Sequence, residues 1–229
     1  MTSTASPAPK RPYPALGAAG TVAGREIARL QGGYLRDESA AVAALARLRR
    51  GVGKGAGTVP DLWGVVDTAD LYAPGGRDEA GTVRAEEAVH TALTLWATHQ
   101  QSRPLPMHRA GGHELGAAVR ELMAHGSNDE ALRKRFVRVG TAGGMPVLAT
   151  RLREIVLLLR QEDIALDYAL LAHQLDAWSR ADGADAVRSA WGRSFHAYRP
   201  RAGQVPADDS FQAIDAGADA GVPDLKDVL

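Results

Sequence analysis

Cysteine is absent from this chain of 229 residues, so the sequence can form neither a disulfide framework nor a thiolate metal site. This absence suits a reducing cytoplasm, where we expect the protein to be located. No stretch approaches the run of about 18 apolar residues that a membrane-spanning helix needs, so no membrane span is expected. The first residues lack the basic segment and apolar run of a signal peptide, so none is expected either.

Lysine is also scarce, because only four of the 27 basic residues are Lys and the others are Arg. A GC-rich genome would explain this usage, and so would a need for bidentate phosphate contacts, which suit arginine. The whole chain has 27 acidic residues, but 201–229 holds six aspartates against two basic residues. The first 200 residues therefore have 25 basic and 21 acidic groups, which predicts a mildly basic folded part and an acidic tail.

Both ends of the chain are poor in large apolar residues. Residues 1–20 are rich in Pro, Ala, Gly and Ser, and residues 201–229 are rich in Asp, Ala and Gly, which predicts two disordered tails. Between them, residues 21–200 are expected to form one helical core, and the apolar content of 45% is enough to fill it. No period-2 alternation typical of strands occurs there. The fold class is therefore predicted to be all-α, a multi-helix bundle of about eight to nine helices.

Apolar residues recur at helical spacing throughout this core. The pattern predicts helices at about 21–32, 38–50 and 82–100, a short turn of helix that begins at Pro60 and includes Leu62 and Trp63, and five more helices between Gly112 and Pro200. One face of each main helix is expected to be buried, and these faces comprise Val42, Leu45, Leu48, Val89, Leu93, Trp96, Leu115, Val119, Leu122, Met123, Leu132, Phe136, Val139, Leu148, Leu152, Ile155, Leu159, Leu171, Leu175, Trp178, Val187, Trp191 and Phe195.

Several polar residues lie where helices are expected to begin. Asp37 or Ser39 can cap the helix at 38–50, and Asp167 can cap the helix that includes Leu171. Ser127 and Glu130 have the spacing of a capping box. His90 and His99 flank the apolar stripe of the helix at 82–100, so both are expected at the surface.

No pattern in the chain assembles a catalytic centre. The glycine-rich stretch 51–58 lacks the Ser or Thr that must follow Lys54 in a phosphate-binding loop, and a helix rather than a strand precedes it. The seven histidines show no metal-ligand spacing, and no nucleophile, base and acid occur in a recognisable order. The sequence therefore predicts no enzyme activity, no bound metal and no cofactor.

Two clusters of basic residues are the remaining candidates for function. Arg47, Arg49, Arg50 and Lys54 lie at the end of the helix at 38–50, where cations also stabilise the helix dipole. Arg133, Lys134, Arg135 and Arg138 share a helix with Leu132, Phe136 and Val139, and Arg151 and Arg153 follow in the next helix. At about 100° per residue, Lys134 and Arg138 lie about 200° and 240° from Leu132, opposite the apolar stripe. This face is either a solvated helix surface or one that follows a phosphate backbone.

Three stretches, taken in order and spacing, carry a resemblance to a known family. The first runs from Leu45 to Gly51 and continues with Pro-Asp-Leu-Trp at 60–63. The second is Met-His-Arg-Ala-Gly-Gly-His-Glu-Leu-Gly at 107–116, continuing to Arg120. The third extends from Leu132 through 152–155 and 166–168 to 187–195. Over about 25–199 the chain resembles the CasB family, the small subunit of the type I-E CRISPR Cascade complex.

The resemblance implies an all-helical, non-enzymatic subunit. Two copies are expected side by side within the complex, next to its other Cascade subunits, the backbone and large subunits. Guide RNA and target DNA are the other expected partners, because family members help to hold the target and displaced strands when the R-loop opens. Met107, His108, Leu115 and Gly116 are expected to be structural, with the glycine permitting close helix packing.

The expected nucleic-acid-binding residues come from two sources. The resemblance points to Arg49, Arg50, Arg138, Arg153 and Arg180. The clustering of basic residues along the chain adds Arg120, Arg133 and Arg135. The modest charge of the folded part leaves room for contacts with protein neighbours to dominate. A helical protein-interaction scaffold without nucleic-acid contact therefore remains the alternative function, and a helical enzyme with a buried pocket is a third.

Overall fold

The computed structural model describes residues 13–73, 77–126 and 128–199. In chain order its helices are α1 (Ala18–Leu35), α2 (Ser39–Arg50), the 3-10 turns η1 (Pro60–Leu62) and η2 (Ala69–Tyr72), α3 (Glu79–Gln100), α4 (Leu115–His125), α5 (Asp129–Gly140), α6 (Met145–Gln161), α7 (Tyr168–Trp178) and α8 (Gly183–Ala197). These ranges contain no strand, and a single β-bridge joins His108 to Leu166. The all-α prediction is confirmed. The tails predicted at 1–20 and 201–229 lie mostly outside the described residues.

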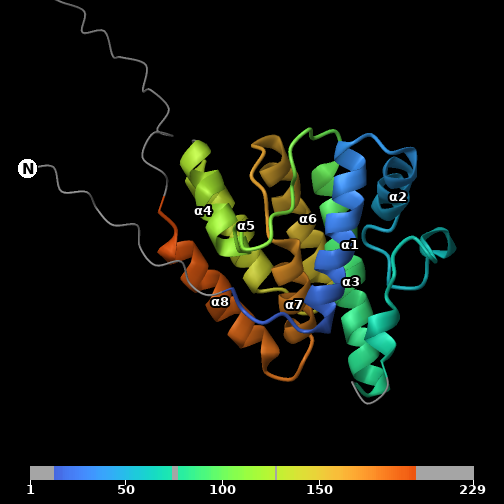
Figure 1. The fold of residues 1–229 in the computed structure, drawn as a ribbon. Coiled ribbons are helices and arrows are strands. Elements are labelled where there is room, and N and C mark those ends of the chain that lie inside the picture. The colour runs from blue at the N-terminus through green and yellow to red at the C-terminus, as the bar shows by residue number, and fades with distance from the viewer. Residues whose placement is uncertain (1–12, 74–76, 127, 200–229) are drawn as a thin grey trace, which may run out of the picture.

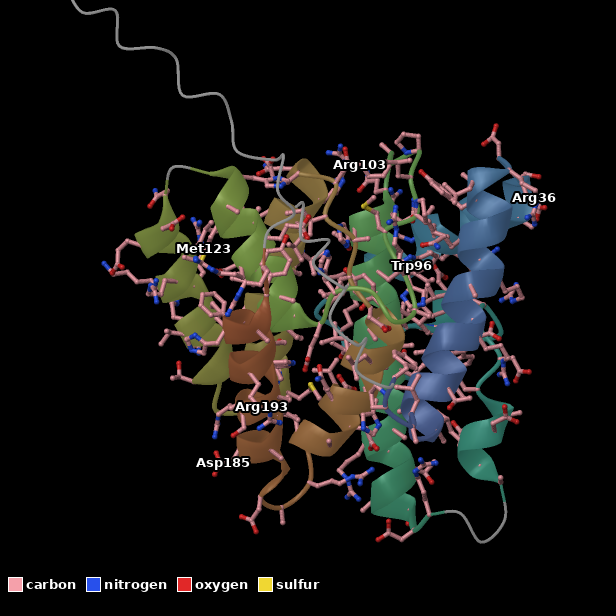
Figure 2. The ribbon with its side chains drawn as sticks, turned by 60° about the vertical axis from the view of Figure 1, so that its left-hand side comes forward. Arg36, Trp96, Arg103, Met123, Asp185 and Arg193 are labelled. Atoms are coloured by element: carbon pink, nitrogen blue, oxygen red, sulfur yellow. The ribbon has the colours of Figure 1, made fainter. Side chains whose placement is uncertain are left out.

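The bundle is organised around α3, which packs against α1, α2, α6 and α7 (Figure 1). The last turns of α3 are buried on every side, and Trp96 in this segment is fully enclosed in the middle of the bundle (Figure 2). The α2 helix lies on one side of α3 and is followed by the two 3-10 turns. The α4, α5 and α8 helices lie on the other side (Figure 1). None of the helices described is long and apolar enough to cross a membrane.

The start of α1 differs from the sequence prediction. The helix begins at Ala18 and ends at Leu35, so it is longer at both ends than the predicted range of 21–32. The backbone N–H of Gly17 donates to Nδ1 of His173 at 3.0 Å, so a contact distant in sequence fixes this entry point. A Cβ at Gly20 would lie 2.8 Å from the carbonyl oxygen of Ala169, so glycine permits the close approach of α1 to α7.

The helix caps are partly as predicted. The Asp167 side chain accepts from the backbone N–H of Leu170 and caps α7, as expected. The cap of α5 is Asn128, whose side chain accepts from the N–H of Ala131, and Ser127 of the predicted capping box lies outside the described residues. The α2 helix begins after Glu38 with no side-chain cap, so neither predicted cap residue acts there.

Three residues lie in environments that the sequence pattern did not predict. Val42 is 37% exposed, because the buried face of α2 is formed by Ala41, Ala44, Leu45 and Leu48. Trp63 is 69% exposed. His99, expected at the surface, is fully buried within α3. The remaining predicted core side chains are buried, except that Phe136 is half-buried.

His99 is part of a polar contact inside the core. Its Nδ1 lies 2.9 Å from the hydroxyl oxygen of Tyr168, which is itself fully buried. Burial disfavours the charged imidazolium and lowers the pKa of His99 to about 3. The imidazole is therefore neutral in the folded protein at any ordinary pH.

This buried histidine predicts acid sensitivity. Between pH 6.5 and about 3 the unfolded chain binds a proton at His99 and the folded chain does not, so the free energy of unfolding falls as pH falls. The expected slope from this group is at most about 1.4 kcal/mol per pH unit. Urea unfolding at pH 7.5, 6.5 and 5 measures it. His99→Asn should reduce the slope and leave the part due to His108 and His173, whose pKa values burial also lowers. An identical slope in the variant would contradict this.

Gly116 allows α4 and α8 to pack closely, as expected from the sequence. A Cβ at this position would lie 1.9 Å from the carbonyl oxygen of Trp191 and 2.7 Å from the backbone nitrogen of Phe195. These are backbone atoms of α8, so the two helices would have to move apart to admit a methyl group. The identity of residue 116 thus sets the distance between the two helices.

Gly116→Ala is therefore expected to lower the free energy of unfolding by about 1–3 kcal/mol, the usual cost of overpacking a core. Gly192→Ala is the matched control, because a Cβ at Gly192 in α8 meets no described atom within 4 Å. That change should stabilise the helix by about 0.5–1 kcal/mol by reducing backbone freedom in the unfolded chain. Urea denaturation of both variants tests the pair. Equal stabilities would show that the helices separate at no cost.

Candidate nucleic-acid interface

The α5 helix has an apolar face and a basic face. Leu132 and Val139 are buried, and the ring of Phe136 stacks on Phe195 of α8 with centroids 5.5 Å apart. The four basic side chains of α5 are all exposed, and these are Arg133, Lys134, Arg135 and Arg138. This arrangement follows from the helical period, which places them away from the buried face.

The basic side chains of α5 and α6 differ in whether they have a partner. Lys134 pairs with Glu130 at 3.5 Å, one turn earlier in the helix. Arg151 of α6 donates to the carbonyl oxygen of Arg138, so it connects the two helices and is not free to bind a ligand. In the described part of the chain, no carboxylate pairs with Arg133, Arg138 or Arg153. These three guanidinium groups are therefore available to an anion from outside.

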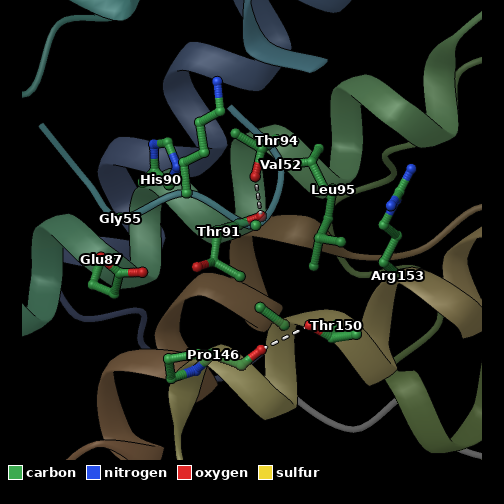
Figure 3. Close-up of a pocket in the computed structure, with 13 residues that line it drawn as sticks. Val52, Gly55, Glu87, His90, Thr91, Thr94, Leu95, Pro146, Thr150 and Arg153 are labelled. Carbon is green, nitrogen blue, oxygen red and sulfur yellow. Dashed lines mark hydrogen bonds between the residues drawn. The ribbon is translucent and has the colours of Figure 1, made fainter. Parts of the chain in front are cut away.

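Arg153 of α6 lies across a hollow from the loop that follows α2. It lines one side of this hollow of about 140 Å³, and Val52 and Gly55 of the loop line another (Figure 3). Lys54 of the same loop is also among the lining residues. The loop is held in place because Glu87 of α3 accepts from the N–H of Ala56 at 2.9 Å and His90 contacts the carbonyl oxygen of Gly51 at 3.2 Å. Lys54 of the loop after α2 and Arg153 of α6 thus border the same hollow.

The other predicted residues lie in different settings. Arg49 is half-buried, and Arg50 is exposed and pairs with Asp61 at 3.4 Å. Arg120 of α4 is half-buried and its guanidinium lies 5.7 Å from the centre of the Phe195 ring. Arg50 and Arg120 are thus partly engaged within the protein.

Two predicted residues border separate hollows. Arg135 lines a hollow with Glu162 and Asn128, near the ends of α4 and α6. Arg180 is bound to the buried Asp176 at 2.5 Å and shares a hollow with Arg77 and Arg84 at the start of α3. The structure therefore brings Arg153 together with the loop after α2, places Arg133 and Arg138 on the adjoining helix, and sets Arg180 apart.

Lys54 and Trp63 were not among the predicted binding residues. Lys54 belongs to a basic cluster that the sequence singled out, and the structure adds that it lines the same hollow as Arg153. Trp63 lies in a short segment without a repeating apolar stripe, which is the one sign in the sequence that it lacks a buried face. Among the residues that the structure describes, no group of three or more His, Asp or Glu side chains is arranged to hold a metal ion.

The fold and this surface together define an all-α bundle protein with an arginine-rich face. Residues 44–196 match the family model described as CRISPR-associated protein Cse2. The chain therefore belongs to the CasB (Cse2) family of type I-E Cascade, whose members are structural subunits of CRISPR effector complexes.

Solved structures agree with this assignment. CasB from Thermobifida fusca is 49% identical with a TM-score of 0.72, and the match covers 80% of this chain and 100% of that one. A Cse2-family protein from Thermus thermophilus is 24% identical with a TM-score of 0.58, over 77% of this chain and 97% of that one, and shows the shared fold. CasB from M. ruber is 25% identical with a TM-score of 0.50, over 67% of this chain and 83% of that one. No curated protein matches the chain.

Proposed function

We propose that this protein is the non-catalytic small subunit of a type I-E CRISPR RNA-guided DNA surveillance complex in the cytoplasm, and that it binds nucleic-acid backbone to stabilise the R-loop and the displaced strand. The observation that carries the proposal is the set of exposed arginines without carboxylate partners on α5 and α6, in a chain of this family. Arginine suits the role because its planar guanidinium is always charged and binds phosphate in a bidentate manner.

A few such contacts are enough to matter. The RNA–DNA heteroduplex that forms is about as stable as the DNA duplex that it replaces, so opening the target is a nearly balanced exchange. Backbone contacts add free energy to the open state without reading its sequence. Arg133, Arg138 and Arg153 are the residues to which we assign this contribution first, and Arg49, Arg50, Arg120, Arg135 and Arg180 are assigned supporting contacts.

The proposed partners are the backbone and large subunits of the complex, the guide RNA, the target DNA and a second copy of this chain. Exposed apolar side chains on the same helices favour protein contacts as well. Val137 on α5 is 56% exposed, Val147 on α6 is 44% exposed and Leu157 is 36% exposed. These side chains give the scaffold without nucleic-acid contact its specific support as the second candidate.

Reconstitution separates the two candidates. The other subunits and the guide RNA are assembled with and without this chain, and the opening of a labelled target duplex is followed by permanganate reactivity of unpaired thymines. If this chain stabilises the R-loop, its omission should reduce opening of the target and protection of the displaced strand at equal amounts of bound guide. A complex without this chain that assembles and opens the target equally well would contradict the proposal. If omission of this chain reduces assembly of the complex, but the complexes that do form open the target duplex normally, the scaffold function would be favoured.

A further inference from the structure

Trp63 is the tryptophan that the fold leaves in solvent. The chain has four tryptophans, and Trp96, Trp178 and Trp191 are at most 6% exposed, whereas Trp63 is 69% exposed. Its indole is nevertheless held in place, because Nε1 donates to the carbonyl oxygen of Gly57 at 3.1 Å. A large, oriented and exposed aromatic side chain is a common feature of binding surfaces.

The indole borders a hollow of about 330 Å³ between the loop after α2 and the middle of α3. Leu62, Val89 and Leu93 form apolar parts of its wall, and Gly57 and Tyr72 also line it. His90 lines both this hollow and the one shared by Lys54 and Arg153, so the two hollows adjoin. An exposed indole and a pair of cations therefore lie on either side of the same loop.

The local charge favours an anionic partner. Arg47, Arg49 and Arg50 in the last turn of α2 and Lys54 in the following loop all precede Trp63 closely in the chain. The nearby carboxylates already have partners inside the protein. Asp61 pairs with Arg50, Glu87 accepts from the N–H of Ala56, and Glu86 accepts from the hydroxyl of Tyr72.

We propose that Trp63 stacks on a base of an unpaired DNA strand whose phosphates lie on Lys54 and Arg153. This inference rests on the proposed function, to which it adds a residue that stacks on a base. Single-stranded nucleic acid is bound by a positively charged groove together with aromatic side chains on which bases stack. A duplex hides its base faces, so it cannot use the indole in this way. Opening a target against a guide leaves one DNA strand unpaired, and that strand is the partner to which the geometry points.

Tryptophan fluorescence gives a specific test, because Trp63 is the exposed indole. The full-length chain is titrated with an oligo(dT) of about 20 nucleotides, a length that exceeds the usual single-strand site size, at low salt. Binding is followed in parallel by the anisotropy of a label on the oligonucleotide. We expect the emission to be quenched as binding proceeds, with little quenching by a duplex. Trp63→Leu should weaken binding roughly 5- to 150-fold, the range for loss of one stacked base. Trp63→Phe should keep most of the affinity and lose the quenching.

Leu105→Ala is the control, because Leu105 is also a large exposed apolar side chain, at 50%, and lines neither of the two hollows. It should bind oligo(dT) as the unmodified chain does, and thermal melting should show all variants folded. Binding without quenching, or unchanged affinity in Trp63→Leu, would overturn the stacking inference and leave the proposed function standing. Quenching by oligo(rU) with none by oligo(dT) would overturn the choice of a DNA strand. If neither the tryptophan emission nor the anisotropy of the label changes during the titration, this chain does not bind single-stranded DNA. Both the proposed phosphate binding and the stacking inference would then be wrong.

Discussion

Replacing Arg138 and Arg153 together by alanine is expected to weaken target binding by the assembled complex and to flatten its dependence on salt. Phosphate contacts release counterions, so removing each one should reduce the slope of log K against log salt by roughly 0.9 for duplex and about 0.7 for a single strand. Both side chains are exposed and neither pairs with a carboxylate in the described residues, so the melting temperature should barely change. Replacement by glutamate should have a larger effect because it adds repulsion.

The matched control for this experiment is Arg36→Ala. Arg36 follows the end of α1, its side chain is 68% exposed, and it pairs with Glu38 at 2.8 Å (Figure 2). Removing it changes the net charge by the same amount per residue but removes no guanidinium from the face of α5 and α6, so the salt slope should stay as it is. A double variant that assembles normally, keeps the full salt slope and supports interference would show that Arg138 and Arg153 are merely solvated. The protein-interaction scaffold would then be better supported than nucleic-acid binding.

Trp191→Ala is expected to have the largest effect on stability, about 3–5 kcal/mol, which is usual for the truncation of a buried large aromatic residue. Trp191 is 1% exposed, its ring stacks on Trp178 with centroids 5.4 Å apart, and its Nε1 donates to Oε1 of Gln174 at 2.7 Å. The change would create a cavity between α7 and α8 and leave the buried amide oxygen without this donor. The melting temperature should fall by roughly 6–20 °C for a core of this size.

Trp63→Ala is the control for that change because it removes the same side chain from an exposed site. We expect it to alter the free energy of unfolding by no more than about 0.5 kcal/mol. Urea denaturation of the two variants, followed by circular dichroism, measures the contrast. If Trp191→Ala left stability unchanged and abolished DNA binding instead, Trp191 would be a binding residue and not part of the core.

The core helices could be predicted from the sequence because their signal is local. The stripe of Leu148, Leu152 and Ile155 needs only the helical period to identify a buried face, and all three are fully buried. The same reasoning correctly placed Lys134 and Arg138 opposite Leu132. The cap at Asp167 is also local, since its side chain bonds an N–H three residues ahead.

The errors occur where a residue's environment depends on elements distant in sequence. His99 lies beside the stripe of its own helix, yet α3 is surrounded by other helices and Tyr168 of α7 contacts the imidazole. An amphipathic pattern assumes one solvent-facing side, and the last turns of α3 have none. The environment of Trp63, for which the sequence made no prediction, is also set by the tertiary structure, which leaves this side chain 69% exposed after a short 3-10 turn.

The sequence by itself determined that the protein is all-helical, which faces of most helices are buried, and which family it resembles, because helical period and ordered motifs are read along the chain. Only the tertiary structure decided which cations border the same hollow. Arg153 and Lys54 are distant in sequence and border one hollow, whereas Arg151, two residues from Arg153, is bound to the backbone of α5. Charges share a ligand when they are close in space, and that distance is set by how α2, α3, α5 and α6 pack.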